Sequence, residues 1–125
     1  MAPSQFASLD GPGVKVTATL EGQVLRVAIA GTVEARDPAA LFDPYWIGLD
    51  EALRREGIKE VELDLFGLDF MNSSGILTLV RWLMKVKAQP AYVILVRHDR
   101  TLTWQKTNVP VLAKLAPSVV RLATP

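Results

Sequence analysis

Two short segments near the start of the chain alternate between apolar and polar residues. In residues 14–20 every second residue is apolar, and Lys or Thr fills the positions between them. Residues 24–30 show the same period of two after a polar Glu-Gly-Gln turn. Because this period is typical of a half-buried strand, the pattern predicts a β-hairpin. The polar, Gly- and Pro-rich residues 1–13 before it are expected to be a flexible lead-in.

Helix and strand patterns follow in turn along the rest of the chain. Asp37 and Pro38 are typical of a helix start, but Pro44 is expected to interrupt this helix or to make it restart at Asp43. Helical spacing is found at 45–55, 75–87 and 102–106, and strand patterns at 58–66, 92–96 and 119–122. This order predicts an α/β fold in residues 14–125. It would be a single domain with a mixed sheet that starts with a β-hairpin and has helices packed against it.

The composition narrows the class of protein. The chain has 125 residues, no Cys and a formal net charge of +1, and half of its residues are apolar. Without Cys there is no disulfide framework and no Cys-based metal site. The net charge gives no electrostatic argument for nucleic acid or for an anionic membrane. With no signal-peptide pattern and no apolar run of roughly 18 residues, a cytoplasmic protein without membrane insertion is expected.

The most informative motif lies between the predicted strand at 58–66 and the predicted helix at 75–87. Residues 70–75 read Phe-Met-Asn-Ser-Ser-Gly. The first N–H groups of a helix have no partner inside it, and the helix dipole favours negative charge there. Ser73 can therefore cap the helix, or it can carry a phosphate whose charge the helix end tolerates.

Three sequence elements together resemble the STAS family, the fold of anti-sigma factor antagonists. Residues 31–34, Gly-Thr-Val-Glu, match the family's glycine and acidic residue after the second strand. Residues 63–65, Leu-Asp-Leu, match the end of its next strand, and residues 70–75 match the Asp-Ser-Ser-Gly element that opens a helix. Residues 106–109 resemble a later Thr-Gly-Leu element, in which Asn108 would replace Gly in the left-handed conformation.

The resemblance implies a non-enzymatic regulatory module that binds other proteins and holds no cofactor. In the family the first Ser of the motif, here Ser73, is phosphorylated by a kinase that is also an anti-sigma factor, and phosphorylation blocks the binding of that kinase. The chain departs from the family at Asn72, which is isosteric with the family's Asp but neutral. Asp69 could supply a charge nearby.

A second kind of partner also follows from the resemblance. Some STAS domains are cytoplasmic accessory subunits of membrane transporters, among them bacterial lipid transporters, and bind the transporter ATPase without phosphorylation. The neutral Asn72 suits this alternative. The candidate partners are therefore an anti-sigma-factor serine kinase and a transporter ATPase.

The helix after the motif carries more apolar residues than one face can hold. One stripe is expected to face the sheet, while Leu77, Trp82 and Met84 lie outside it. These three residues form either a partly exposed partner site or contacts beneath the aromatic segment at 42–46. That segment belongs to a stretch that is longer here than in the family.

A small hydrolase that uses Ser73 or Ser74 is the weaker alternative. It would need a base such as His98, the only histidine of the chain, and no Gly-x-Ser-x-Gly elbow is present. No metal site is expected at His98. We therefore predict no catalytic residue. The predicted partner-contact residues are Glu34, Asp64, Asp69, Asn72, Ser73, Ser74, Gly75, Leu77 and Met84.

Overall fold

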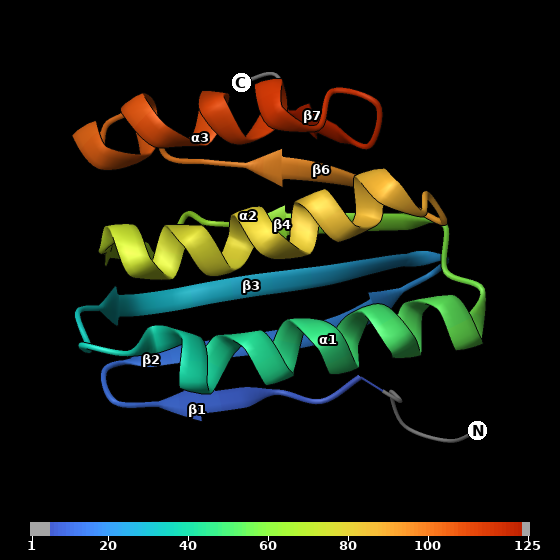
Figure 1. Ribbon diagram of the computed structural model, residues 1–125, viewed down its shortest axis with the longest axis horizontal. Coiled ribbons are helices and arrows are strands. Elements are labelled where there is room, and N and C mark those ends of the chain that lie inside the picture. Colours follow the sequence, from blue (N-terminus) through green and yellow to red (C-terminus); the bar gives the residue numbers. More distant parts are fainter. Residues whose placement is uncertain (1–5, 124–125) are drawn as a thin grey trace.

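The computed structural model describes residues 6–123, which form one mixed sheet with three helices packed on one of its faces (Figure 1). The strands are β1 (Leu9–Gly11), β2 (Val14–Glu21), β3 (Val24–Val33), β4 (Glu60–Asp64), β5 (Leu68–Met71), β6 (Val93–Arg97) and β7 (Val120–Leu122). The helices are α1 (Pro38–Glu56), α2 (Ser73–Ala88) and α3 (Thr103–Leu115). The predicted α/β fold is confirmed.

The strand order of the sheet is β1-β2-β3-β4-β6-β7, and β5 pairs with the end of β3. The pairs β1–β2 and β2–β3 are antiparallel, and β2–β3 is the predicted hairpin. The pairs β3–β4, β4–β6 and β6–β7 are parallel, as is β3–β5. Parallel strands end at a common edge, so the segments that follow β3, β5 and β6 leave the sheet there.

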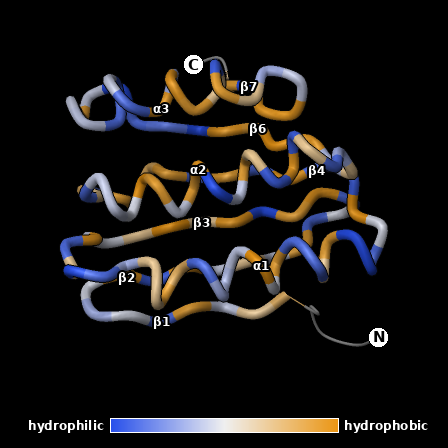
Figure 2. Tube along the Cα trace, viewed as in Figure 1, coloured by the Kyte–Doolittle hydropathy of each residue, from blue (hydrophilic) through white to orange (hydrophobic). Residues whose placement is uncertain are grey.

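The sheet has one buried face and one open face. The buried face belongs to a single core, and Figure 2 shows its apolar strands beside helices of mixed hydropathy. On the open face two ion pairs join neighbouring strands. Arg26 lies 2.7 Å from Asp64, and Arg97 lies 2.6 Å from Glu62. All three helices therefore pack on the apolar side, with α2 between α1 and α3 (Figure 1).

Helix α1 continues through Pro44, so the predicted interruption is wrong. Proline in a helix interior costs about 3 kcal/mol because it removes a hydrogen bond and crowds the preceding turn. The buried face of α1, which includes Phe42, Trp46 and Leu53, opposes this cost. Burial of each large apolar side chain contributes roughly 1.5–3 kcal/mol, so the packed face keeps the helix continuous.

Helix α3 is longer than the turn predicted at 102–106. It runs to Leu115 and includes Pro110, and its residues Val109 and Leu112 are buried in the core. Asn108 is not left-handed, because within residues 6–123 only glycines have a positive φ. Its side-chain amide instead donates to the carbonyl oxygen of Trp104 at 2.7 Å.

Two strands lie where the sequence predicts none. Residues 9–11 of the predicted lead-in form β1, because Leu9 pairs with Val16 of β2, and the prediction is wrong for these residues. Residues 1–5 of that segment lie outside the described part of the chain. Strand β5 follows β4 after a turn at 65–67 and pairs with the end of β3. This pairing sets the motif directly beside the loop that follows β3.

A buried polar network fixes α2 against α1. Asp50 is 1% exposed and accepts hydrogen bonds from Tyr92 at 2.6 Å and from Arg54 at 3.0 Å. Trp82 donates to the Tyr92 hydroxyl at 3.0 Å, and its ring stacks on Trp46 with the ring centroids 4.6 Å apart. Burial alone would raise the pKa of Asp50, but the hydrogen bonds from Arg54 and Tyr92 lower it below its usual value.

Candidate functional site

The motif forms a short junction between β5 and α2. Ser73 is the first residue of α2, and Asn72 is its N-cap with an extended backbone. The side-chain oxygen of Asn72 accepts a hydrogen bond from the Gly75 N–H at 2.8 Å. Capping of α2 is therefore done by Asn72, one residue before the position that the sequence favours as a cap.

Asn72 also joins the motif to the loop between β3 and α1. Its side-chain amide donates to the carbonyl oxygen of Ala35 at 2.9 Å, and its backbone N–H donates to the carbonyl oxygen of Val33 at 3.0 Å. A carboxylate cannot donate the first of these hydrogen bonds. Asn therefore has a structural role here that the Asp of the resembling family could not fill.

Gly75 is buried, so its predicted place among the contact residues has a steric explanation. A Cβ atom at this position would lie 2.7 Å from Cγ of Met71 and 3.0 Å from Cγ1 of Val33. The first turn of α2 can approach β3 and β5 only because this residue has no side chain. Gly75 shapes the site, and its neighbours in the motif present the accessible groups.

Ser73 and Ser74 are both exposed. Within residues 6–123, neither hydroxyl takes part in a hydrogen bond. The Ser73 hydroxyl stands beside the free N–H groups of the first turn, where the helix dipole favours an anion. Both side chains are therefore available for modification or for a partner.

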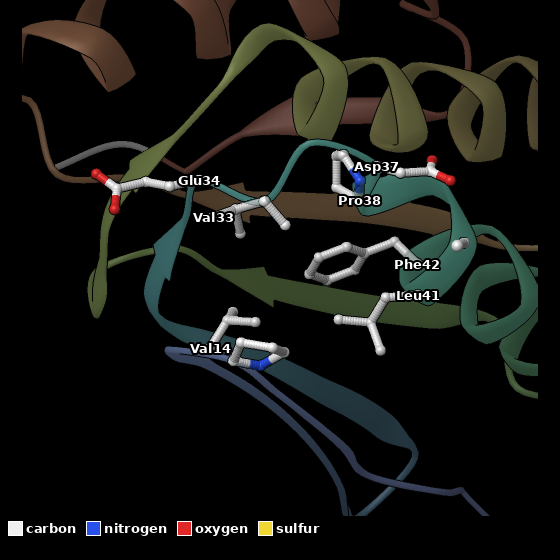
Figure 3. Close-up of a pocket in the computed structure, with 10 residues that line it drawn as sticks. Val14, Val33, Glu34, Asp37, Pro38, Leu41 and Phe42 are labelled. Atoms are coloured by element: carbon white, nitrogen blue, oxygen red, sulfur yellow. The ribbon is translucent and has the colours of Figure 1, made fainter.

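Glu34 lies in the loop that Asn72 joins to the motif, between the two residues that accept hydrogen bonds from Asn72. It follows β3 directly and is exposed, and Figure 3 shows it directed away from the apolar side chains of the neighbouring cavity. This cavity has a volume of about 310 Å³ and lies between the β1–β2 turn and the start of α1. Its walls include Val14, Val33, Leu41 and Phe42 (Figure 3). Glu34 and the motif thus share one edge of the molecule.

Asp64 is placed differently from the other predicted contact residues. Its side chain is 14% exposed and forms the ion pair with Arg26 on the open face of the sheet. It also accepts a hydrogen bond from the Phe66 N–H at 2.9 Å. Its carboxylate therefore has structural partners on β3 and in the turn after β4.

Asp69 and Phe70 connect the motif to α3 through contacts with Trp104. The indole N–H of Trp104 donates to the carbonyl oxygen of Asp69 at 2.7 Å, and the Trp104 ring meets Phe70 edge to face at 6.4 Å. Phe70 is 41% exposed, so it adds an aromatic group to the surface next to Ser73. The motif sequence contains Phe70, but nothing local indicates its contact with Trp104, 34 residues away.

Gln105 supports the same segment from within the core. Its side-chain amide donates to the carbonyl oxygens of Leu65 and Leu68 at 2.7 and 2.8 Å. Its side-chain oxygen accepts from the Asp99 N–H at 2.8 Å. Gln105 is fully buried, so its three hydrogen bonds hold these backbone groups together inside the core. No sequence signal marks this residue, because its role depends on the β4–β5 turn and the loop after β6 meeting at α3.

The two interpretations of the apolar residues on α2 apply to different side chains. Trp82 is buried beneath the aromatic segment of α1, where it stacks on Trp46. Leu77 and Met84 are 50% and 41% exposed. With Ser73 they follow at intervals of four and seven residues, which places all three along one side of the helix.

No catalytic arrangement surrounds the serines in the described residues. His98 is half-buried after β6 and forms no hydrogen bond with Ser73 or Ser74 within residues 6–123. Burial and the charge of Arg100 lower its pKa, while Asp99 opposes this shift. In the same part of the chain, no group of three His, Asp or Glu residues is placed to hold a metal ion. Between residues 6 and 123, no helix has the length and apolar character needed to cross a bilayer.

The comparisons with known proteins identify the fold. No protein-family model matches the sequence, and no curated protein matches it. The structure is similar to the crystal structure of an anti-sigma factor antagonist from Mycobacterium paratuberculosis, with a TM-score of 0.59. The match covers 99% of this chain and 92% of that chain at 14% sequence identity. The chain therefore has the STAS fold, with little sequence identity to that protein.

Proposed function

We propose that this protein is a non-enzymatic regulatory module that binds a partner protein through the edge formed by Glu34 and the motif. The observation that carries this proposal is the exposed Ser73 hydroxyl at the first turn of α2, held by the Asn72 cap. Phe70 lies on one side of Ser73 and Leu77 follows on the helix, and both are exposed. An accessible hydroxyl beside exposed apolar groups suits a contact that a modification can block.

Phosphorylation of Ser73 is the proposed control of this contact. A phosphate adds nearly two negative charges and three acceptor oxygens, which the free N–H groups of the first turn of α2 can stabilise. The fold need not change. A partner that covers Phe70 and Leu77 would have to bury the phosphate, and this cost would weaken binding.

The proposal is tested with the partner recovered from the native host. Ser73→Asp should weaken its binding at least about tenfold, and Ser73→Ala should bind as the unmodified protein does, because only the first adds a charge at the contact. Ser118→Asp, at an exposed serine in the turn before β7, is the matched control. Equal binding by all four proteins, together with no phosphate on Ser73 in cells, would reject the switch.

The remaining predicted contacts are tested separately from the switch. Leu77→Glu and Met84→Glu should weaken partner binding with little change in the free energy of unfolding, because both side chains are largely exposed. Val93→Glu, at an exposed position on the open face, is the control. A large loss of thermal stability in the α2 variants would mean that these residues act in the core.

An accessory subunit of a transporter is the second candidate, and Asn72 is the observation that favours it. Its side-chain amide, which donates a hydrogen bond to Ala35, stands where the phosphorylated members of the resembling family carry a carboxylate. In this case the same edge would bind a transporter ATPase and Ser73 would carry no phosphate in cells, although Ser73→Asp would still add a charge at the contact. The identity of the recovered partner separates a kinase from an ATPase.

A further inference from the structure

The net charge of +1 conceals a strong separation of charge along the chain. Residues 1–72 contain six basic and twelve acidic residues, whereas residues 73–125 contain eight basic residues and one acidic residue. The second group forms α2, β6, α3 and β7. In Figure 1, β6, α3 and β7 lie together at one side of the molecule, and α2 lies between α3 and α1. The separation in sequence is therefore also a separation in space.

The two helices of the basic side carry no acidic residue. Helix α2 contains Arg81, Lys85 and Lys87, and α3 contains Lys106 and Lys114. Helix dipoles account for basic residues in the last turns. They do not account for the lack of Asp and Glu in the first turns of both helices, where the dipole favours acids.

The basic residues of α2 and α3 differ in whether a nearby carboxylate neutralises their charge. Arg81 pairs with Asp43 at 2.8 Å, and Lys85 lies 3.6 Å from Asp50. Lys87 donates to the carbonyl oxygen of Leu115 at 3.1 Å, which leaves its charge uncompensated. Among residues 6–123, neither Lys87 nor Lys114 has a carboxylate within salt-bridge distance. Lys106, nearer the start of α3, likewise has no salt bridge in this part of the chain, and Lys87 and Lys114 place uncompensated positive charge where the two helices meet.

Exposed apolar side chains lie among these bases. Leu77 and Met84 of α2 are 50% and 41% exposed, and Val111 and Leu115 of α3 are 49% and 37% exposed. The exposed side of α3 that carries Val111 and Leu115 lies next to α2, and contacts near both ends of α3 show this. Trp104, seven residues before Val111, contacts the segment before α2, and the carbonyl of Leu115 accepts from Lys87. We define the α2–α3 face as Leu77, Met84, Lys87, Val111, Lys114 and Leu115.

We propose that the α2–α3 face binds an acidic amphipathic helix of the partner protein, an inference that rests on the proposed function. The face continues from Ser73 along α2, so a partner seated on the motif edge can extend over it. Apolar residues in rows along two neighbouring helices suit the apolar stripe of a third helix. The surrounding lysines favour Glu and Asp on the flanks of that helix.

The test uses the intact protein and a synthetic peptide helix of about 18 residues, roughly 27 Å long, with a Leu stripe flanked by Glu. A second peptide with Lys in place of every Glu is its matched control. Binding is measured by fluorescence anisotropy, and amide NMR shifts locate the site. Vesicles containing phosphatidylglycerol form a separate arm, because an anionic bilayer is the other surface that such a face could meet.

The Glu peptide should bind at the α2–α3 face, and the Lys peptide should not. Lys87→Glu with Lys114→Glu should weaken the Glu peptide at least about tenfold, since each reversal replaces attraction by repulsion. Lys15→Glu with Lys59→Glu makes the same change in net charge at exposed positions elsewhere, and should leave binding within about twofold. Raising salt from about 50 to about 300 mM should weaken binding.

Three results would overturn this inference. They are no binding of the Glu peptide, equal binding of the two peptides, and binding to vesicles in place of the peptide. None of them depends on Ser73. The proposed function fails independently, through unchanged partner binding in the Ser73 variants.

Discussion

Asn72 joins three parts of the structure through a single residue. Its side-chain oxygen caps α2, its side-chain amide holds the loop after β3, and its backbone N–H continues the pairing of β5 with β3. The sequence identified this position by comparison with Asp in the resembling family. The sequence could not reveal the hydrogen bond from the Asn72 side-chain amide to Ala35, because Ala35 lies 37 positions away.

Replacement of Asn72 should separate its two side-chain roles. Asn72→Ala removes the cap and the bond to Ala35 and should lower the free energy of unfolding by about 2 kcal/mol, the sum of a typical cap and hydrogen bond. Asn72→Asp keeps the acceptor and loses only the donor, so it should cost about 1 kcal/mol. Urea denaturation measures both values, and an equal loss in the two variants would contradict this division of roles.

Gly75 and Gly48 offer a matched pair of glycines within helices. Gly75→Ala places a methyl group against Met71 and Val33, and should destabilise by about 1–3 kcal/mol. At Gly48 a Cβ atom meets no heavy atom within 4 Å. Gly48→Ala should therefore stabilise the protein by about 0.5–1 kcal/mol through the higher helix propensity of Ala. Thermal denaturation of the two variants should show shifts of opposite sign.

At the scale of elements, repeating patterns were more informative than single residues. The β2–β3 hairpin and helix α2 followed from their periods of two and about four. The proline at 44 was misleading, because it lies in a helix whose apolar face is buried. Strand β5 was missed for the opposite reason. It has four residues, and its strand character comes from pairing with β3.

The contact between α1 and α2 should make stability depend on pH. The folded pKa of Asp50 is lowered, so the stability that this group contributes is present above its unfolded pKa. It is lost as the pH falls through the folded value, below about pH 4. The difference in unfolding free energy between the native protein and Asp50→Asn should therefore shrink below that pH. A constant difference between about pH 7 and pH 3 would argue against an ionised Asp50 in the fold.

At the scale of the whole molecule, formal charge and charge distribution lead to different conclusions. The net charge alone gave no reason to expect an electrostatic contact. The distribution of charge does give such a reason. Acidic residues are in excess in the first part of the sequence and basic residues in the last part, and the strand order keeps these two parts apart. The sequence alone could have shown the imbalance between the two halves. Its gathering on neighbouring helices needed the strand order.

Ion-exchange chromatography can test this separation without any partner. Lys87→Glu with Lys114→Glu and Lys15→Glu with Lys59→Glu produce proteins of identical net charge. A charged resin favours the orientation that presents the oppositely charged side of the protein, so local charge matters as well as the total. On a cation exchanger at neutral pH the first pair should elute at lower salt than the second. Identical elution of the two variants would show that the distribution of charge does not affect binding to the resin.

Both ends of the strand order are closed by strands of only three residues, β1 and β7. An exposed edge can add a strand from another chain, and a long, regular edge is the usual starting point of aggregation. Three residues offer few free backbone groups for such growth. The molecule can therefore leave one whole face of its sheet uncovered and still resist stacking into ribbons of copies.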